Sequence, residues 1–126
     1  MPQNAQSANV AVTPTPGAHA APLQLDQSGN LLTGNGSTNK LNITASAVIK
    51  ASAGRVCKVT VVAVATAGTF GVYDAATTGA AATANAVLQY ASGYPAVGTV
   101  IPLDFPCLTG IVVNPGTGGQ VSVSFD

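Results

Sequence analysis

The sequence contains no tryptophan and no glutamate, and it is poor in every other charged residue. Charged side chains make up 6% of the 126 residues, against roughly a quarter in typical globular proteins. Four acidic and four basic residues cancel, so the formal net charge is zero. A neutral surface with few charges keeps a free monomer poorly soluble. The composition therefore favours a protein whose surface is partly covered by other subunits.

The shortage of charge also excludes several functions. Four scattered basic residues form no patch that would neutralise phosphates, so we expect no nucleic-acid binding. No apolar run approaches the ~20 residues that span a bilayer, so no membrane insertion is expected. The first residues, Met1–Asn4, lack the features of a signal peptide, which predicts folding in a reducing cytoplasm. Cys57 and Cys107 are then expected to be buried free thiols rather than a disulfide.

Residues that carry catalysis are equally scarce. The only histidine, His19, lies in a segment without periodicity, so it is a poor partner for a Ser or Cys nucleophile. One His and two Cys have no zinc-ligand spacing. Asp74 and Asp104 are conceivable as the paired carboxylates of a glycosidase, but both lie at expected strand ends, where Asp typically caps backbone amides. We predict no enzyme, no cofactor and no metal site.

The most prominent stretch that is present is Arg55–Thr66, the longest β-branched apolar run. Valine packs well on a pleated surface, so the run predicts a strand. Apolar residues alternate with Lys58 and Thr60 from Cys57 to Val61, as in a strand with one wet face. The alternation stops at Val61–Ala65, which predicts that both faces of this end are covered.

Further short strands are expected along the chain, separated by Gly- and Pro-rich turns. An N-terminal hairpin is predicted at residues 23–33, and Ala75–Asn85 is expected to be a loop, with room for one helical turn. Asp104–Gly110 is read as an irregular corner and Pro115–Gly119 as a turn. The remaining strands are expected at Leu41–Ala51, Thr69–Asp74, Ala86–Ala91, Val97–Leu103, Gly110–Asn114 and Gln120–Phe125. About eight short antiparallel strands predict an all-β fold, a β-sandwich of jelly-roll type.

The first 22 residues contain Ala, Gln, Asn, Thr and Pro without periodicity, and Thr13–Gly17 favours an extended path. Two interpretations of this segment remain. It is either a disordered tail or an arm that lies on a neighbouring subunit. The predicted domain organisation is an extended arm at residues 1–22 and a β-sandwich domain at residues 23–126.

Several segments of the chain resemble small virion proteins of tailed bacteriophages. These segments are Pro22–Leu32, Ala53–Val56, Val72–Ala76, Asp104–Cys107 with Gly110–Val113, and Pro115–Ser124. Within that group the chain looks most like the capsid decoration (cement) proteins. The resemblance implies a non-enzymatic subunit on the outer capsid surface that stabilises the joints between capsomers. It also implies that the partners are the major capsid protein and further copies of the chain, as dimers or trimers, in a virion assembled in the host cytoplasm.

The contacts of such a subunit are expected in the arm and at the strand edges. The predicted interface residues are Asn9, Val10, Val12, Pro14, Pro16, Pro22, Arg55 and Lys58. One alternative is another virion role, as a head-fibre base, tail or baseplate subunit. A second is a carbohydrate-binding β-sandwich that would use Tyr73, Tyr90 and Tyr94, although tyrosines at strand ends more often bury their rings.

Overall fold

The computed structural model describes residues 27–28 and 36–126 of the chain. The chain divides into two units, Met1–Gly34 and Asn35–Asp126. In the first unit Gln27 and Ser28 lie in a turn, at the point where the sequence predicts one. Three predictions lie outside the described residues. They are the two strands of the N-terminal hairpin, the arm at residues 1–22 and the domain boundary at residue 23.

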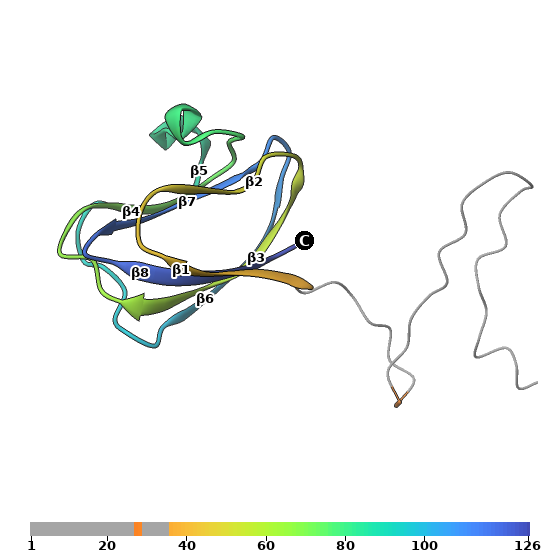
Figure 1. Cartoon of the computed structure of the whole chain (residues 1–126), viewed down its shortest axis with the longest axis horizontal. Helices are drawn as coiled ribbons and strands as arrows, with labels where there is room; N and C mark the ends of the chain where they lie inside the picture. The colour runs from red at the N-terminus through yellow and green to blue at the C-terminus, as the bar shows by residue number, and fades with distance from the viewer. Residues whose placement is uncertain (1–26, 29–35) are drawn as a thin grey trace, which may run out of the picture. The chain divides into compact units, whose positions relative to one another are not determined.

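Residues 36–126 form two four-stranded antiparallel sheets, the two layers seen in Figure 1. The first sheet has the strand order β1-β8-β3-β6. Its strands are β1 (Thr38–Ile43), β8 (Gln120–Phe125), β3 (Gly54–Ala63) and β6 (Val100–Cys107). The strand β8 has the predicted bounds, and it lies inside the sheet between β1 and β3.

The second sheet has the strand order β2-β7-β4-β5. Its strands are β2 (Ala47–Lys50), β7 (Ile111–Thr117), β4 (Ala67–Tyr73) and β5 (Ala86–Tyr90). Two 3-10 turns, η2 (Thr78–Ala80) and η3 (Thr83–Asn85), precede β5 in the predicted loop. The described residues contain no α-helix, so the prediction of an all-β fold is confirmed.

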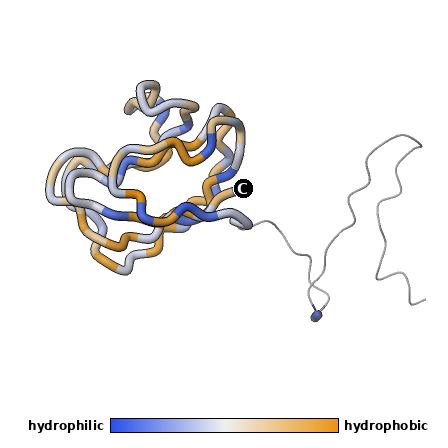
Figure 2. The backbone as a smooth tube through the Cα atoms, in the orientation of Figure 1, coloured by the Kyte–Doolittle hydropathy of each residue, from blue (hydrophilic) through white to orange (hydrophobic). Residues whose placement is uncertain are grey.

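The larger of two hydrophobic clusters forms the core between the two sheets, and the smaller contains Tyr73, Ala75 and Val112. The larger cluster is built mainly from valine, together with one phenylalanine, two isoleucines and one cysteine. Its buried members are Ile43, Val56, Val59, Val61, Phe70, Val72, Cys107, Ile111, Val113, Val121 and Val123. Figure 2 shows hydrophobic stretches in both layers. Because both sheets contribute side chains to the same core, the arrangement is β-sandwich-like.

The central stretch of the sequence is strand β3, but its end differs from the prediction. The expected alternation is present, since Val59 and Val61 are buried while Lys58 is exposed. The strand ends at Ala63, and Val62 is 45% exposed. The prediction of two covered faces at Val61–Ala65 is therefore wrong, because no layer of the described chain covers the outer side of the first sheet.

The stretch predicted as one strand at Leu41–Ala51 is two strands in different sheets. β1 pairs with β8 of the first sheet, and β2 pairs with β7 of the second. The ladder of β1 is irregular between Lys40 and Ile43, where Asn42 has a φ of 57°. Asn tolerates this left-handed conformation better than most residues. The irregularity is followed at once by the crossing of the chain from one sheet to the other.

Two proline-containing stretches differ from their predictions. Asp104–Gly110 was predicted as a corner and Pro115–Gly119 as a turn, but each begins with residues of a strand. β6 continues through Pro106 to Cys107, and it lies at the edge of its sheet. Proline is tolerated in an edge strand because an amide facing away from the neighbour makes no ladder bond. Likewise, β7 continues through Pro115, which pairs with Phe70 of β4 on one side. On the other side the paired residues of β2 stop at Ala47, opposite Val113.

Candidate interaction surface

The predicted interface residues fall into two groups. The six from the predicted arm (Asn9, Val10, Val12, Pro14, Pro16 and Pro22) lie outside the described residues. The other two, Arg55 and Lys58, lie on β3. Arg55 Nη1 donates to Oδ1 of Asp104 at 3.0 Å and to the carbonyl oxygen of Asp104 at 2.9 Å. Both side chains of this ion pair are substantially solvated, so it contributes little to stability.

Lys58 lies on the side of the first sheet that faces away from the core. The register places it between Ser124 of β8 and Pro102 of β6, and Ser124 is also paired with Asn39 of β1. Directly opposed residues in antiparallel strands point to the same face. These four residues therefore form one row across the sheet.

A second row of the same face contains Ser122, Thr60 and Val100, which are paired in that order on β8, β3 and β6. Leu41 of β1 is 65% exposed beside this row, and Val62 and Val100 are 45% and 52% exposed. A groove of about 140 Å³ runs over this part of the sheet. Its lining residues are Asn39, Leu41, Lys58, Thr60, Ser122, Val123 and Ser124. We call the two rows together with Leu41 and Val62 the outer face.

The aliphatic members of the outer face were not predicted as interface residues. Leu41 and Ile43 are two residues apart, so a regular strand would turn both to the same side. Instead, the irregular ladder at Asn42 leaves Leu41 exposed and Ile43 buried at 3% exposure. Val62 and Val100 are exposed because no other part of the described chain covers this side of the sheet. No spacing in the sequence marks these residues, because their exposure depends on a local break in the ladder and on an uncovered sheet.

A different exposed side chain, Leu108, lies in the loop between β6 and β7 and is 80% exposed. Asp74 holds this loop through three backbone amides. Its carboxylate accepts from Leu108 N at 3.0 Å, Thr109 N at 2.8 Å and Gly110 N at 3.2 Å. Partial burial alone would raise the pKa of Asp74, but the three amides outweigh it and the pKa is lowered. The predicted capping role of Asp74 is confirmed, whereas the Asp104 carboxylate pairs with Arg55.

Replacing Asp74 with asparagine is expected to lower the free energy of unfolding by about 1–2 kcal/mol, because a charged acceptor for three amides is lost. The amides of Leu108, Thr109 and Gly110 should then exchange with solvent faster, which hydrogen-exchange NMR measures. Asp104→Asn is the matched control, and it should change stability by less than about 0.5 kcal/mol. Equal effects of the two variants would contradict the role of Asp74.

A third carboxylate, Asp126, holds the beginning of β1. Its Oδ1 accepts from the backbone N of Ser37 at 2.8 Å and from Ser37 Oγ at 2.7 Å, and its Oδ2 accepts from Gly36 N at 3.2 Å. The Ser37 amide and hydroxyl, with the Gly36 amide, lower the pKa of Asp126 to about 2. All three carboxylates of the described residues are thus engaged within the chain.

The two cysteines are both buried and both free, as predicted. Burial, assisted by the negative charge of Asp74, raises the pKa of Cys107 to about 11. Burial likewise raises the pKa of Cys57, and the neighbouring carboxylate of Asp126 adds to the shift. Both thiols are therefore poor nucleophiles at neutral pH, because the thiolate is the reactive form.

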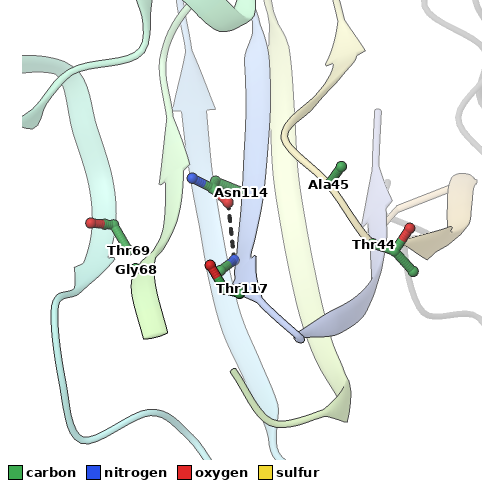
Figure 3. A pocket seen from close by; sticks show the side chains of 7 residues that line it. Thr44, Ala45, Gly68, Thr69, Asn114 and Thr117 are labelled. Atoms are coloured by element: carbon green, nitrogen blue, oxygen red, sulfur yellow. Dashed lines mark hydrogen bonds between the residues drawn. The ribbon is translucent and has the colours of Figure 1, made fainter. Parts of the chain in front are cut away.

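A second hollow, of about 290 Å³, lies just before the start of β2, beside β7 and β4 (Figure 3). Its lining is neutral and contains Thr44, Thr69, Asn114 and Thr117. The side-chain oxygen of Asn114 accepts from Gly116 N at 3.0 Å, the bond drawn in Figure 3. No aromatic residue lines this hollow, so it lacks the stacking surface typical of sugar sites.

The three tyrosines of the described residues are held by contacts within the protein. Tyr73 is buried at 6% exposure. Tyr90 packs edge-to-face on Phe70 with ring centroids 5.8 Å apart. The Tyr94 hydroxyl lies within hydrogen-bond distance of the carbonyl oxygens of Gly68 and Ala91, and its single proton is donated to one of them at a time. These contacts favour the reading in which the rings are packed against the protein.

Residues 27–28 and 36–126 contain no group of three or more His, Cys, Asp or Glu side chains that would hold a metal ion. Within the same residues no helix is long and apolar enough to cross a membrane. No family model, curated protein or solved structure shows a significant match to the chain.

Proposed function

We propose that the chain is a structural subunit of a tailed-phage virion, and more specifically a capsid decoration (cement) protein. The observation that carries the proposal is the outer face, which has exposed aliphatic side chains and only one charged residue, Lys58. Leu41, Val62 and Val100 of this face are 65%, 45% and 52% exposed. Exposed apolar groups gathered on one surface are typical of sites where proteins bind one another.

We further infer that the two sheets form a jelly roll. Strand pairs β4–β5, β3–β6, β2–β7 and β1–β8 are all antiparallel. This is the pairing of one long hairpin whose tip is β4–β5. The additional pairs β3–β8 and β4–β7 join successive layers of that hairpin. Rolling up such a hairpin produces the double-sheet architecture that viral capsid domains share with lectins and cupins.

In this role the β-sandwich-like domain would bind two neighbouring capsomers at once and so stabilise the joint between them. An interface of standard size buries ~800 Å² on each partner. Many copies on one shell raise the effective affinity of an assembly of weak contacts. No catalytic group is required for this mechanism. The predicted partner is the major capsid protein, with homo-oligomers that follow the local capsid symmetry.

The test is the addition of the purified chain to heads of the encoding phage assembled without it. We expect the chain to sediment with the heads and to raise the temperature at which they release DNA on heating. Heads incubated with buffer alone provide the baseline. An unchanged release temperature, or association with tails instead of heads, would count against cementing and favour the other virion roles.

The carbohydrate-binding alternative has one observation in its favour, the hollow lined by threonines and Asn114. The contacts of Tyr73, Tyr90 and Tyr94 with the rest of the protein argue against carbohydrate binding. Binding of the chain to a polysaccharide array would support this alternative.

A further inference from the structure

The outer face contains one cation, Lys58, that has no partner among the described residues. The Lys58 ammonium makes no ion pair or hydrogen bond with the described residues. The hydroxyls of Thr60 and Ser122, which line the same groove, also make none. The Ser124 Oγ is buried without a hydrogen-bond partner. A buried hydroxyl without a partner is unfavourable, but an atom so covered is out of reach of a molecule on the surface. The donors that the groove offers to an added acceptor are the Lys58 ammonium and the hydroxyls of Thr60 and Ser122.

The described chain has no carboxylate left for this groove. Asp74 is engaged by the loop that follows β6, Asp104 by Arg55, and Asp126 by the beginning of β1. The fourth acid of the chain, Asp26, lies outside the described residues. Within residues 36–126 no side-chain carboxylate is left to pair with Lys58, so this part of the chain offers an unmatched positive charge. This is an argument from charge complementarity between the groove and its occupant.

We propose that the outer face is a docking surface for a neighbouring protein, and that the occupant inserts an aspartate or glutamate against Lys58 between aliphatic side chains. The proposal rests on the proposed function, in which the chain acts by binding other proteins. The carboxylate would accept hydrogen bonds from Lys58 and from the adjacent hydroxyls. Aliphatic side chains of the occupant, on either side of its acid, would pack on Leu41, Val62 and Val100, which are about half exposed or more.

The surroundings of Lys58 distinguish this occupant from others. A nucleic acid requires several cations along its path, and Lys58 is the only charged residue that lines the groove. A second copy placed across a two-fold axis would bring the same patch onto itself. Two Lys58 ammonium groups would then face one another, and residues 36–126 hold no unpaired acid to separate them. The face thus fits a different protein that carries the opposite charge.

The experiment compares Lys58→Glu with Lys40→Glu in sedimentation with heads assembled without the chain. The two variants change the net charge equally. Lys40 is exposed on β1 but is paired with Val123, whose side chain is in the core, so it points away from the groove. We expect Lys58→Glu to weaken binding at least tenfold and Lys40→Glu to change it by less than threefold. Leu41→Ser, which keeps Lys58, should weaken binding several-fold. Thermal melts establish that all three variants are folded.

The outcomes separate the two proposals. If the unchanged chain does not bind heads, the proposed function fails. If it binds and Lys58→Glu binds equally well, the docking surface is wrong while the proposed function stands. Analytical ultracentrifugation of the chain alone adds a further check. A homodimer that Lys58→Glu dissociates would assign the outer face to contacts between copies and would overturn the proposal.

Discussion

Replacing Phe70 with alanine is expected to lower the free energy of unfolding by about 3–5 kcal/mol, the usual cost of truncating a buried phenylalanine. Phe70 is 2% exposed on β4, inside the core, and its ring meets that of Tyr90 edge-to-face. The variant leaves a cavity and also removes the aromatic contact. For a domain of this size the melting temperature should fall by at least about 12 °C. Calorimetry or urea denaturation measures the change.

Val62→Ala is the matched control on the neighbouring sheet. Its side chain is 45% exposed on the outer face, so the change should cost less than about 1 kcal/mol. Phe70→Leu should lie between the two and remain folded, which allows a measurement even if Phe70→Ala does not fold. Similar losses in Phe70→Ala and Val62→Ala would mean that the core does not lie between the two sheets.

Replacing Gly110 with alanine is expected to destabilise the protein by about 3 kcal/mol, at the upper end of the usual cost of overpacking. A Cβ atom at this position would lie 2.4 Å from the carbonyl oxygen of Ala75 and 2.8 Å from that of Lys50. Both contacts are with backbone, which cannot move aside as a flexible side chain would. Gly110 is buried, and its own carbonyl oxygen accepts from Ala75 N at 3.2 Å. Urea denaturation measures the loss.

Gly79→Ala provides the comparison. A Cβ atom at Gly79 meets nothing within 4 Å, and the residue is exposed in the 3-10 turn η2. Its replacement should leave stability unchanged or raise it slightly, because alanine restricts the unfolded chain. If both glycine variants behaved alike, the close packing of the β6–β7 loop against Ala75 and β2 would be refuted.

Some strands could be predicted from local pattern alone. The alternation of valine with serine in Gln120–Phe125 defines β8 to the residue, because one side of the strand is in the core and the other is not. The exclusion of a disulfide followed from the expected reducing environment, and both thiols are free. Lys58 was predicted as an interface residue, and this stays a prediction. The structure shows that Lys58 is exposed on the outer face.

Other features could not be predicted, because they depend on what lies beside a strand. Pro106 and Pro115 are typical of turns, yet each is part of a strand that lacks a paired neighbour on one side of the proline. The stretch Leu41–Ala51 has apolar residues throughout, and only the crossing between sheets divides it into β1 and β2. The role of Asp74 depends on amides 34 to 36 residues away.

The sequence by itself determined that this protein is an all-β chain with a valine-rich core and very few charges. These properties are local, since side-chain branching and alternation of polarity act on the strand that contains them. Only the tertiary structure decided which strands are neighbours, which sheet face is left uncovered and where each carboxylate is used. The outer face exists because β1, β8, β3 and β6 meet there from distant parts of the chain. Contacts of that kind are set by the packing of the whole core.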